Sequence, residues 1–598
     1  MAAPARGRRF GLVLVALLLG GLLVSLLPAA GLAAPPATPT PVTTGVPRFE
    51  PGPCAYTLPK DQQEGKTVVC GYAVVPERHE NPKGKTIKLP VAVYKARGAA
   101  PQDSAWDKPA AEPIILLAGG PGQSDQVFAT LLTASSPYYR GLTATHDVVI
   151  FDQRGTGKAQ PSLACPELTS SSLGGQVLVQ ALDTQSAFVA AALRCRDRLA
   201  GQGIDLAAYT TTENAADVND VRAVLGYPAM DLYGGSYGSA LGLAVERDFP
   251  GVVHAAVLES IVPPQVAWIF APPQTFDRVL HELFRACAAD AACNTTYPDL
   301  QGAFQRGVAR LNATPARVQV TDPASGETVG VPVTGTLYSQ LLFNLFYVTQ
   351  VIPYLPDMIA RVDRGDTAFL GVLLPLLLQP GEPLSYGMHF SAACSGNVST
   401  QQYQQALAAD AKILPEARAA LEPTFVRDYY AICQQWPSRG ADPKSTRPAA
   451  STVPTLLVSG QFDPITPPAY ADLARESLPH STGVVLPGGG HTPTFAIPCG
   501  FNLALAFVAN PGAAPDTSCV AQLGVTFKPL PAELAGGPAP SPSPSPSPAP
   551  MPGLPNTGSG GAMAAVPDAG LPLFLGLIVV GVLGLGLGAR GPRARGRR

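Results

Sequence analysis

Residues 230–250 read MDLYGGSYGSALGLAVERDFP, and they place the pattern G-x-S-x-G between a short apolar run and a helical run. The serine of this pattern is Ser236, with Gly234 two residues before it and Gly238 two residues after it. A sharp strand-to-helix turn requires small residues at these two positions, because side chains there would collide with neighbouring backbone. The context predicts a nucleophilic Ser236 exposed above a β-sheet. The alternative is a loop of glycine and serine without catalytic function.

A serine hydroxyl needs an adjacent base to act as a nucleophile, and two late segments supply a base and an acid. Asp463 follows the run TLLVSGQF, and His491 follows the run VVLPGGG. Both residues come after predicted strands, so both are expected at the carboxyl edge of a parallel sheet, beside Ser236. The rivals are His480, which precedes its strand, and Asp472, which lies in a helical pattern. We predict Ser236, His491 and Asp463 to form a catalytic triad.

Acyl transfer also requires hydrogen-bond donors at the developing oxyanion. One expected donor is the amide of Tyr237, the residue after the nucleophile. The second should come from the loop AGGPGQS at 118–124, whose glycines leave the backbone accessible to a substrate carbonyl. The alternative for these glycines is an ordinary turn.

Apolar, β-rich runs alternate with helical patterns around these motifs, which predicts a mainly parallel sheet covered by helices on both faces. The first two runs are expected to form an antiparallel edge, because only a short turn region separates them. The eight expected strands span residues 67–75, 87–94, 114–118, 148–152, 231–233, 255–259, 455–459 and 484–486.

Between residues 263 and 450 the alternation stops, and helical sequence rich in Leu, Ala and Pro follows. We interpret 263–450 as a mainly helical cap inserted after the sixth strand, which divides the core into 54–262 and 451–530. Trp268 and Phe270 of the cap are candidates to line an ester or lipid pocket. Ordinary core packing of these two side chains is the alternative.

Two further motifs make the pattern more specific. GGPG at 119–122 and FDQRGTGKAQPS at 151–162 precede GGSYGS at 234–239, and the late Asp and His follow. Together they resemble the proline iminopeptidase and tripeptidyl aminopeptidase branch of the α/β-hydrolases, over about residues 54–521. The resemblance implies an α/β-hydrolase fold and a serine hydrolase that cleaves peptide bonds near a free N-terminus.

The resemblance also implies roles for individual residues. It assigns the second oxyanion donor to the amide of Gly120, and it places Asp152 and Arg154 in a structural DxRGxG turn. Relatives often carry His before GGPG, where this chain has Ala118. That difference removes a loop-stabilising hydrogen bond but no member of the triad.

An aminopeptidase needs a carboxylate to pair with the ammonium group of its substrate, because an unpaired buried charge is costly. Glu259, at the end of a predicted strand, is the candidate, and a solvated glutamate is the alternative. Many relatives carry an acidic residue just after a cap cysteine resembling Cys394, whereas this chain has SGN at 395–397. Three classes therefore stay open: an aminopeptidase, a carboxylesterase or lipase, and a non-catalytic surface protein on a hydrolase scaffold.

The formal net charge is -2, only 14% of the residues are charged, and long basic runs are confined to the extreme ends. Such a surface does not attract a polyanion, so nucleic acid is not expected as a partner. The motifs CxxC and HExxH do not occur, so neither a metal nor another cofactor is expected. The expected partner is a peptide or small acyl substrate.

The ten cysteines are an even number, and if the chain is exported, as its first 33 residues predict, they favour disulfides over metal sites. Short loops are the easiest to close, so neighbouring cysteines are expected to pair. Connectivity does not follow from the sequence alone, and buried free thiols are the alternative for any pair. The expected pairs are Cys54–Cys70, Cys165–Cys195, Cys287–Cys293, Cys394–Cys433 and Cys499–Cys519.

The N-terminal residues 1–33 are predicted to be an export signal. Arginines come first, an apolar run spans 10–27, and small residues suitable for cleavage follow. A retained membrane anchor is the alternative. Residues 34–53, rich in Pro and Thr, are expected to form an extended linker to the core.

The C-terminal residues 531–598 are predicted to tether the enzyme outside the cell. A Pro/Ser-rich linker at 531–553 contains SPSPSPSP, and the sequence LPNTG, an apolar run and an arginine-rich tail follow in 554–598. This order resembles a cell-wall sorting signal, which implies that a sortase cuts between Thr557 and Gly558 and joins the chain to the wall. A permanent membrane span is the alternative. Membrane contact is thus expected only through the terminal segments.

Overall fold

The computed structural model describes residues 45–97, 112–168, 185–321, 328–377, 384–396 and 398–535. The predicted export signal lies outside these residues, as do Thr557, Gly558 and the apolar run that follows them. Within the described ranges, no helix combines the length and the apolar character that crossing a membrane requires.

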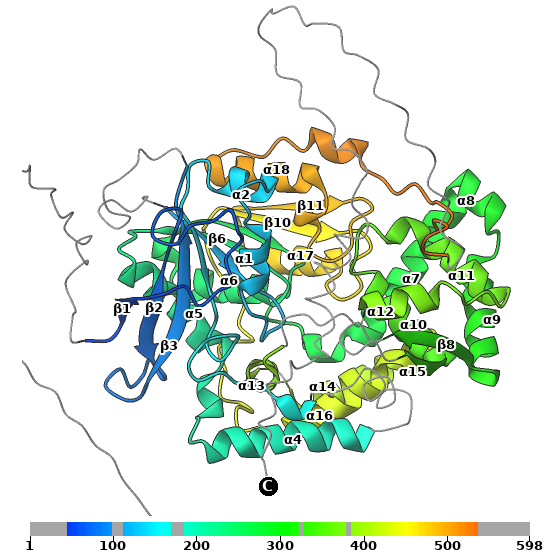
Figure 1. The fold of residues 1–598 in the computed structure, drawn as a ribbon, viewed down its shortest axis with the longest axis horizontal. Helices are drawn as coiled ribbons and strands as arrows, with labels where there is room; N and C mark the ends of the chain where they lie inside the picture. Colours follow the sequence, from blue (N-terminus) through cyan, green and yellow to red (C-terminus); the bar gives the residue numbers. More distant parts are fainter. Residues whose placement is uncertain are drawn as a thin grey trace, which may run out of the picture. The chain divides into compact units, whose positions relative to one another are not determined.

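The centre of the fold is a nine-stranded mixed sheet in the order β1-β2-β3-β5-β4-β6-β7-β10-β11 (Figure 1). The pairs from β5 to β11 are parallel, whereas β1, β2, β3 and β5 are joined by antiparallel pairs. The strands span Arg48–Pro51 (β1), Val68–Pro76 (β2), Thr86–Tyr94 (β3), Ile114–Leu117 (β4), Val148–Phe151 (β5), Met230–Gly235 (β6), Val253–Glu259 (β7), Thr455–Gly460 (β10) and Ser481–Leu486 (β11).

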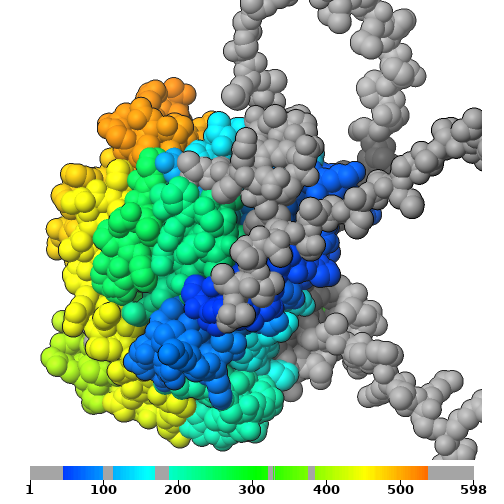
Figure 2. Space-filling model, turned by 90° about the vertical axis from the view of Figure 1, so that its left-hand side faces the viewer, coloured from blue at the N-terminus to red at the C-terminus, as the bar shows by residue number. Residues whose placement is uncertain are grey.

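The sheet has one strand more than the eight that the sequence predicts. β1 lies within 34–53, a segment whose composition predicts a linker, and it pairs with β2. Gly71 of β2 makes room for this strand, because a Cβ there would lie 2.4 Å from the ring of Phe49. The edge strand is therefore β1 rather than β2. Figure 2 shows this N-terminal part, coloured blue, at the surface.

Alternating side chains of the strands fill a separate apolar core on each face of the sheet. Along β4, Ile115 and Leu117 belong to one core, and Ile114 and Leu116 belong to the other. The first core is covered by α5 (Thr211–Val224), α6 (Tyr237–Asp248) and α17 (Pro468–Arg475), and the second by α1 (Gln126–Leu131), α2 (Pro137–Leu142) and α18 (Pro498–Ala509). This layering confirms the predicted sheet with helices on both faces.

The chain between β7 and β10 forms the cap, which has an apolar core of its own. The cap is mainly helical, as predicted, and it adds one hairpin of β8 (Ala316–Thr321) and β9 (Thr328–Val333). Its helices are α7 (Pro272–Ala289), α8 (Ala291–Thr296), α9 (Leu300–Ala313), α10 (Gly335–Leu345), α11 (Leu355–Asp363), α12 (Leu370–Leu377), α13 (Tyr386–Ser395), α14 (Thr400–Asp410), α15 (Pro415–Leu421) and α16 (Tyr429–Cys433). The core helix α4 (Gln185–Gly201) packs against α13 and α16.

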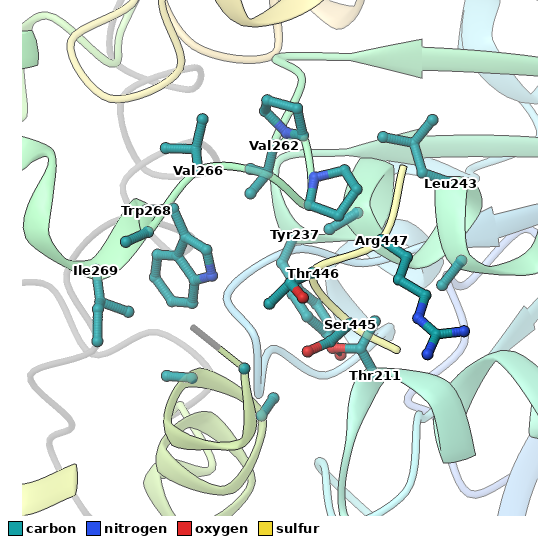
Figure 3. A pocket seen from close by; sticks show the side chains of 18 of the residues that line it. Thr211, Tyr237, Leu243, Val262, Val266, Trp268, Ile269, Ser445, Thr446 and Arg447 are labelled. Carbon is teal, nitrogen blue, oxygen red and sulfur yellow. Dashed lines mark hydrogen bonds between the residues drawn. The ribbon is translucent and has the colours of Figure 1, made fainter. Parts of the chain in front are cut away.

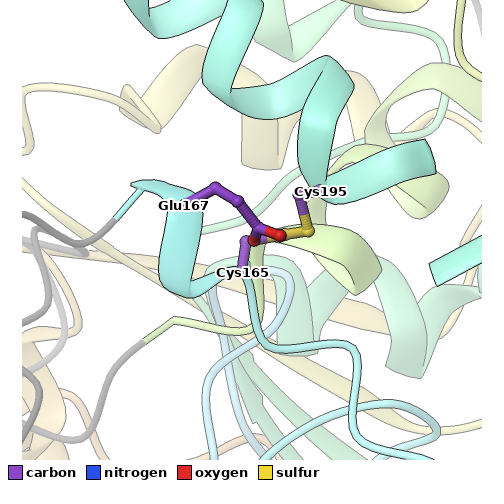
Figure 4. Close-up of side chains that lie close together, drawn as sticks. All are labelled: Cys165, Glu167 and Cys195. Atoms are coloured by element: carbon purple, nitrogen blue, oxygen red, sulfur yellow. A yellow bond between two sulfur atoms is a disulfide. The ribbon is translucent and has the colours of Figure 1, made fainter. Parts of the chain in front are cut away.

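All ten cysteines form disulfides between sequence neighbours. The pairs are Cys54–Cys70, Cys165–Cys195, Cys287–Cys293, Cys394–Cys433 and Cys499–Cys519, the same pairs that short loops predict. Glu167 lies close to the second pair (Figure 4), but its carboxylate bonds to Arg198 at 2.6 Å. Because both sulfurs are already bonded to each other, this cluster offers no thiolate ligand to a metal.

The segment after α18 returns to the cap. The amide of Lys528 donates to the carbonyl of Pro353, and the amide of Leu530 donates to the carboxylate of Asp357. The Leu530 side chain is buried in the apolar core of the cap. The described chain is thus held to the domain up to the predicted start of the second linker.

Candidate active site

The nucleophile elbow is formed where β6 ends and α6 begins. Ser236 lies between the two elements with φ of 57°, a left-handed conformation that costs energy for a residue other than glycine. A Cβ at Gly234 would lie 2.4 Å from the carbonyl oxygen of Gly238, and one at Gly238 would lie 2.0 Å from that of Leu117. Both glycines are therefore required for the turn, which leaves Ser236 partly exposed.

Asp463 and His491 form the acid–base pair at the same edge of the sheet. His491 Nδ1 lies 2.8 Å from Asp463 Oδ2. Asp463 is fully buried, and the side chain of His491 is 9% exposed. Because the carboxylate accepts the Nδ1 proton, Nε2 is left without a proton and can take one from a serine.

The alternative base, His480, and the alternative acid, Asp472, lie away from this edge of the sheet. His480 is exposed and bonds to the carbonyl of Thr452, at the amino-terminal side of β10 and β11. The side chain of Asp472 is exposed on α17. Neither is paired in a way that supports an acid–base role.

Asp463 is surrounded by donors that stabilise its ionised form. Burial alone would raise the pKa of this carboxyl, but the interaction with His491 and the amides of Thr466 and Ile465 outweigh burial and lower its pKa. The Thr466 hydroxyl adds a bond of 2.7 Å to Oδ2. Asp463 therefore remains a carboxylate and is placed to stabilise an imidazolium at His491.

Ser260 is a site residue that the sequence analysis missed. Its hydroxyl donates to Asp463 Oδ2 at 2.8 Å and accepts the amide of Thr492 at 2.8 Å. It follows β7 directly and has φ of 51°. Ser260 thus links the acid to the loop that carries His491. The only signal in the sequence was a serine directly after a strand of the same sheet.

The elbow of Ser236 packs tightly against the loop of Gly119 and the loop of Thr492. A Cβ at Gly235 would lie 2.9 Å from Thr492 Cγ2, next to His491, and one at Gly119 would lie 3.1 Å from Ser236 Cβ. Within the described residues, Ser236 Oγ has no hydrogen bond to His491. Catalytic hydrogen bonds of enzymes without substrate are often long and tighten in the substrate complex. The three predicted triad residues are therefore gathered at one edge.

Of the two predicted oxyanion donors, Tyr237 follows Ser236 in the chain, and Gly120 lies in the loop that contacts Ser236 through Gly119. Tyr237 is the first residue of α6, so its amide has no acceptor within the helix. Gly119 contacts Ser236, and the next residue, Gly120, has φ of 105°. A side chain at Gly120 is excluded both by this conformation and by its approach to Gly122.

The cap holds the oxyanion loop in place. The amide of Ser385 donates to the carbonyl of Gly122 at 2.9 Å, and His389 Nδ1 lies 3.0 Å from the carbonyl of Pro121. His389 Nε2 lies 2.8 Å from the hydroxyl of Tyr429. Burial lowers the pKa of His389 to about 4, so the ring is neutral, donates from Nδ1 and accepts from Tyr429. His389 is therefore a positioning residue. It stabilises the oxyanion loop with a hydrogen bond that the side chain of Ala118 cannot make.

We expect His389→Phe to lower kcat by about tenfold while KM changes by less than about twofold. The reason is that the carbonyl of Pro121 loses the donor that fixes it, so the amide of Gly120 is less well placed for the oxyanion, and oxyanion donors act mainly in the transition state. The measurement is steady-state kinetics on a short chromogenic substrate, with thermal unfolding as a check of the fold. Tyr429→Phe is the matched control, because it keeps the bond to Pro121. An equal loss of kcat in the control would contradict this role.

The cap also contacts the loops of the histidine and the acid. The amide of His491 donates to the carbonyl of Tyr347, whose ring centroid lies 4.8 Å from that of the imidazole. Thr349 Oγ1 accepts the amide of Gly490 at 3.0 Å. Arg278 of α7 donates to the carbonyl of Asp463. Cap residues thus contact the oxyanion loop, the loop of His491 and the loop of Asp463.

The DxRGxG motif is structural, as the resemblance implies. Arg154 is fully buried and donates two hydrogen bonds to Asp217, each of 2.7 Å, and further bonds to backbone carbonyls. Asp152 accepts the Ser124 hydroxyl at 2.8 Å. Gln153 between them donates to the carbonyl of Ala118 at 2.9 Å. The motif therefore fixes the base of the oxyanion loop.

Glu259 lies beneath the active site. It is 1% exposed, its Oε2 accepts the amide of Thr494 at 2.9 Å, and its carbonyl accepts the amide of Ser236. Burial raises the pKa of this carboxyl to about 7. Such a group supports the histidine loop and does not present a free carboxylate to an ammonium group in this conformation.

We expect Glu259→Gln to weaken the dependence of stability on pH. The carboxyl titrates near 4.5 in the unfolded chain and near 7 in the fold, so the fold holds the extra proton between these values and stability falls as the pH rises. The variant should lose this decline, which is on the order of 1–3 kcal/mol in the free energy of unfolding. Urea unfolding at pH 5 and pH 8 measures it. An unchanged difference between the two pH values would contradict the assignment.

A cavity of about 50 Å³ lies beside Tyr237, between α6 and the cap (Figure 3). Its wall includes Trp268, one of the predicted pocket residues, and Arg447, but it does not include Ser236. Phe270, the other predicted pocket residue, is buried in apolar packing. The cavity therefore neighbours the oxyanion side of the site and does not contain the nucleophile.

Comparisons with known proteins identify a family and several similar proteins. A family model described as alpha/beta hydrolase fold matches residues 112–495. Serine protease Hip1 of Mycobacterium tuberculosis is 26% identical over 458 residues, which cover 71% of this chain and 82% of that protein. Tripeptidyl aminopeptidase of Streptomyces coelicolor is 29% identical over 202 residues, which cover 33% of this chain and 36% of that protein. The crystal structure of proline iminopeptidase from Mycobacterium smegmatis covers 74% of this chain and 98% of its own, with 14% identity and a TM-score of 0.35.

The residues matched by the family model amount to more than half of the chain. They include Ser236, Asp463 and His491, which lie on the loops that follow β6, β10 and β11. The chain belongs to the alpha/beta hydrolase fold family.

Proposed function

We propose that this serine hydrolase is an exported peptidase that cleaves peptide bonds near a free N-terminus, of the tripeptidyl or prolyl aminopeptidase type. The observation that carries the proposal is the pair of Asp463 and His491 beside Ser236 in its strained elbow. The similarity to proteins named serine protease Hip1 and tripeptidyl aminopeptidase supports a peptide substrate.

The chemistry proceeds through an acyl-enzyme. His491 Nε2 takes the proton of Ser236 as Oγ attacks the scissile carbonyl. The oxyanion that forms accepts hydrogen bonds from the amides of Tyr237 and Gly120. His491 then gives this proton to the leaving amine as the peptide bond breaks. Water attacks the ester at Ser236 and gives its proton to His491, which returns it to the serine as the new carboxyl group leaves. Asp463 stabilises the imidazolium in both halves.

Carboxylester hydrolysis by the same triad is the second candidate, and the cavity favours it. An aminopeptidase needs a carboxylate for the substrate ammonium. The described residues that line the cavity include Arg247 and Arg447 and no acidic side chain, and Glu259 is buried away from it. Gly396 also lines this cavity, and it belongs to the SGN segment that stands where many relatives carry an acidic residue.

A panel of substrates separates the two candidates. Tripeptidyl and single-aminoacyl chromogenic amides are compared with the same amides after N-acetylation and with short acyl esters. The proposal expects cleavage of the free amides and at least a tenfold loss on acetylation, since the ammonium then cannot bind. Cleavage of esters alone would replace the peptidase by the second candidate. Equal inertness of the wild type and Ser236→Ala would support a non-catalytic scaffold.

We also propose that the chain is exported and attached to the cell wall through Thr557. The five disulfides support an oxidising compartment, where such bonds form and persist. The test is fractionation of cells that express the wild type or a variant in which LPNTG at 554–558 is replaced by alanines. The wild type should be released only by digestion of the wall, and the variant should leave the wall fraction. Extraction of the wild type by detergent alone would instead identify a permanent membrane anchor.

A further inference from the structure

The amino-terminal edge of the central sheet, opposite the candidate active site, gathers four ionisable side chains from four adjacent strands. His146 and Glu112 each precede a strand by two residues, β5 and β4 respectively. Asp231 and His254 are the second residues of β6 and β7. The order β5-β4-β6-β7 makes these strands neighbours. Residues that are far apart in the sequence are therefore brought to one place by the topology of the sheet.

Three of these side chains form a compact group of metal-binding atoms. His254 Nδ1 lies 2.9 Å from Asp231 Oδ1 and 3.8 Å from Glu112 Oε2, and one ligand atom of each residue lies within 4.8 Å of the others. Tetrahedral ligands at about 2.1 Å from a zinc ion are about 3.4 Å apart, so only small shifts of the side chains are needed. Glu112 is 38% exposed and His254 35%, which leaves an ion a path from solvent.

The buried carboxylate at the centre of this group is incompletely satisfied. Asp231 is fully buried, and among the described residues its Oδ2 has no hydrogen-bond partner. His146 Nδ1 lies 3.9 Å away, but it donates its proton to the carbonyl of Glu112 at 3.0 Å. An unpaired oxygen of a buried carboxylate is costly. A cation bound here would remove that cost.

We propose that Glu112, Asp231 and His254 form a binding site for one divalent first-row transition metal ion, with zinc as the best match. One imidazole and two carboxylates suit zinc, whereas calcium and magnesium prefer ligands that are all oxygen. The fourth position is taken by water from the exposed side. The ion ties together the starts of β4, β6 and β7. The site does not include Ser236, Asp463 or His491 and is independent of the proposed peptidase activity.

The experiment is calorimetric titration of the untagged, chelator-treated chain with zinc chloride, with magnesium chloride as the comparison. The wild type should bind one zinc ion and gain thermal stability from it, because a ligand that binds only the folded state stabilises that state. Asp231→Asn and His254→Gln should each weaken zinc binding by at least about tenfold. His480→Gln is the matched control, since it removes an exposed histidine outside the group.

Zinc binding that is equal in the wild type and His254→Gln would overturn the proposal, as would an equal loss in His480→Gln. A wild type that binds no zinc would overturn it as well. If Asp231→Asn does not fold, the zinc affinities of His254→Gln and Glu112→Gln test the proposal instead. Both side chains are partly exposed, so their substitution should leave the fold intact. Loss of stability in these variants without zinc binding by the wild type would identify an ordinary ion pair of Asp231 and His254.

Discussion

Ser236→Ala is expected to lower kcat by about 10⁵ to 10⁶-fold, while KM stays within about threefold and the fold is retained. The hydroxyl oxygen is the atom that forms the acyl bond, and Ser236 lies against the loop of Gly119, in the elbow that also packs against Thr492, the neighbour of His491. Steady-state kinetics on the best amide or ester of the substrate panel measures this change. The residual activity should come from the oxyanion donors alone.

Ser477→Ala is the matched control for this experiment. Among the residues that the structure describes, its hydroxyl bonds only to the carbonyl of Ala474, after α17 and outside the site. This variant should keep full activity. If Ser236→Ala retained more than about a hundredth of the wild-type kcat, the nucleophile would have to be another group.

Asp463→Asn is expected to lower kcat by about 10⁴-fold. Asp463 Oδ1 accepts the amides of Ile465 and Thr466, so the oxygen of an asparagine would occupy that side. Its NH2 group would then replace Oδ2 and donate to His491 Nδ1. The imidazole would carry its proton on Nε2 and could no longer accept the proton of Ser236.

Ser260→Ala provides a graded comparison for Asp463→Asn. It removes one donor to Oδ2 and the acceptor of the Thr492 amide but keeps the carboxylate. We expect a loss in kcat of about tenfold, which is far smaller. The pH profile of kcat/KM should keep its shape in Ser260→Ala. Equal effects of the two substitutions would show that the charge of Asp463 is not what supports His491.

Much of the fold follows from local sequence patterns. Strands such as β4 and β10 are short apolar runs bounded by turn residues, and their positions match the prediction closely. The placement of Ser236, Asp463 and His491 at one edge of the sheet was predictable because each of them follows a strand. β1 was not predictable, because its stability comes from pairing with β2 and from the space that Gly71 leaves for Phe49.

Several contacts between distant segments could not be predicted from the sequence. Ser260 is one serine among many, and its role depends on contact with Asp463, which lies 203 positions further along the chain. His389 meets Pro121 across 268 residues. The burial of Glu259 depends on the loop of Thr494 folding over it. Periodicity reports which side of an element is apolar, but it does not report which distant loop covers a polar group.

Covalent labelling with a fluorophosphonate, followed by peptide mapping, tests the central claim most directly. Such a probe reacts with a serine only when a neighbouring base has activated it. The account predicts a single adduct on Ser236 in the folded wild type, loss of the adduct in the unfolded protein, and strongly reduced labelling in Asp463→Asn. A folded wild type that takes up no label, or that takes it up at a different residue, would contradict the account.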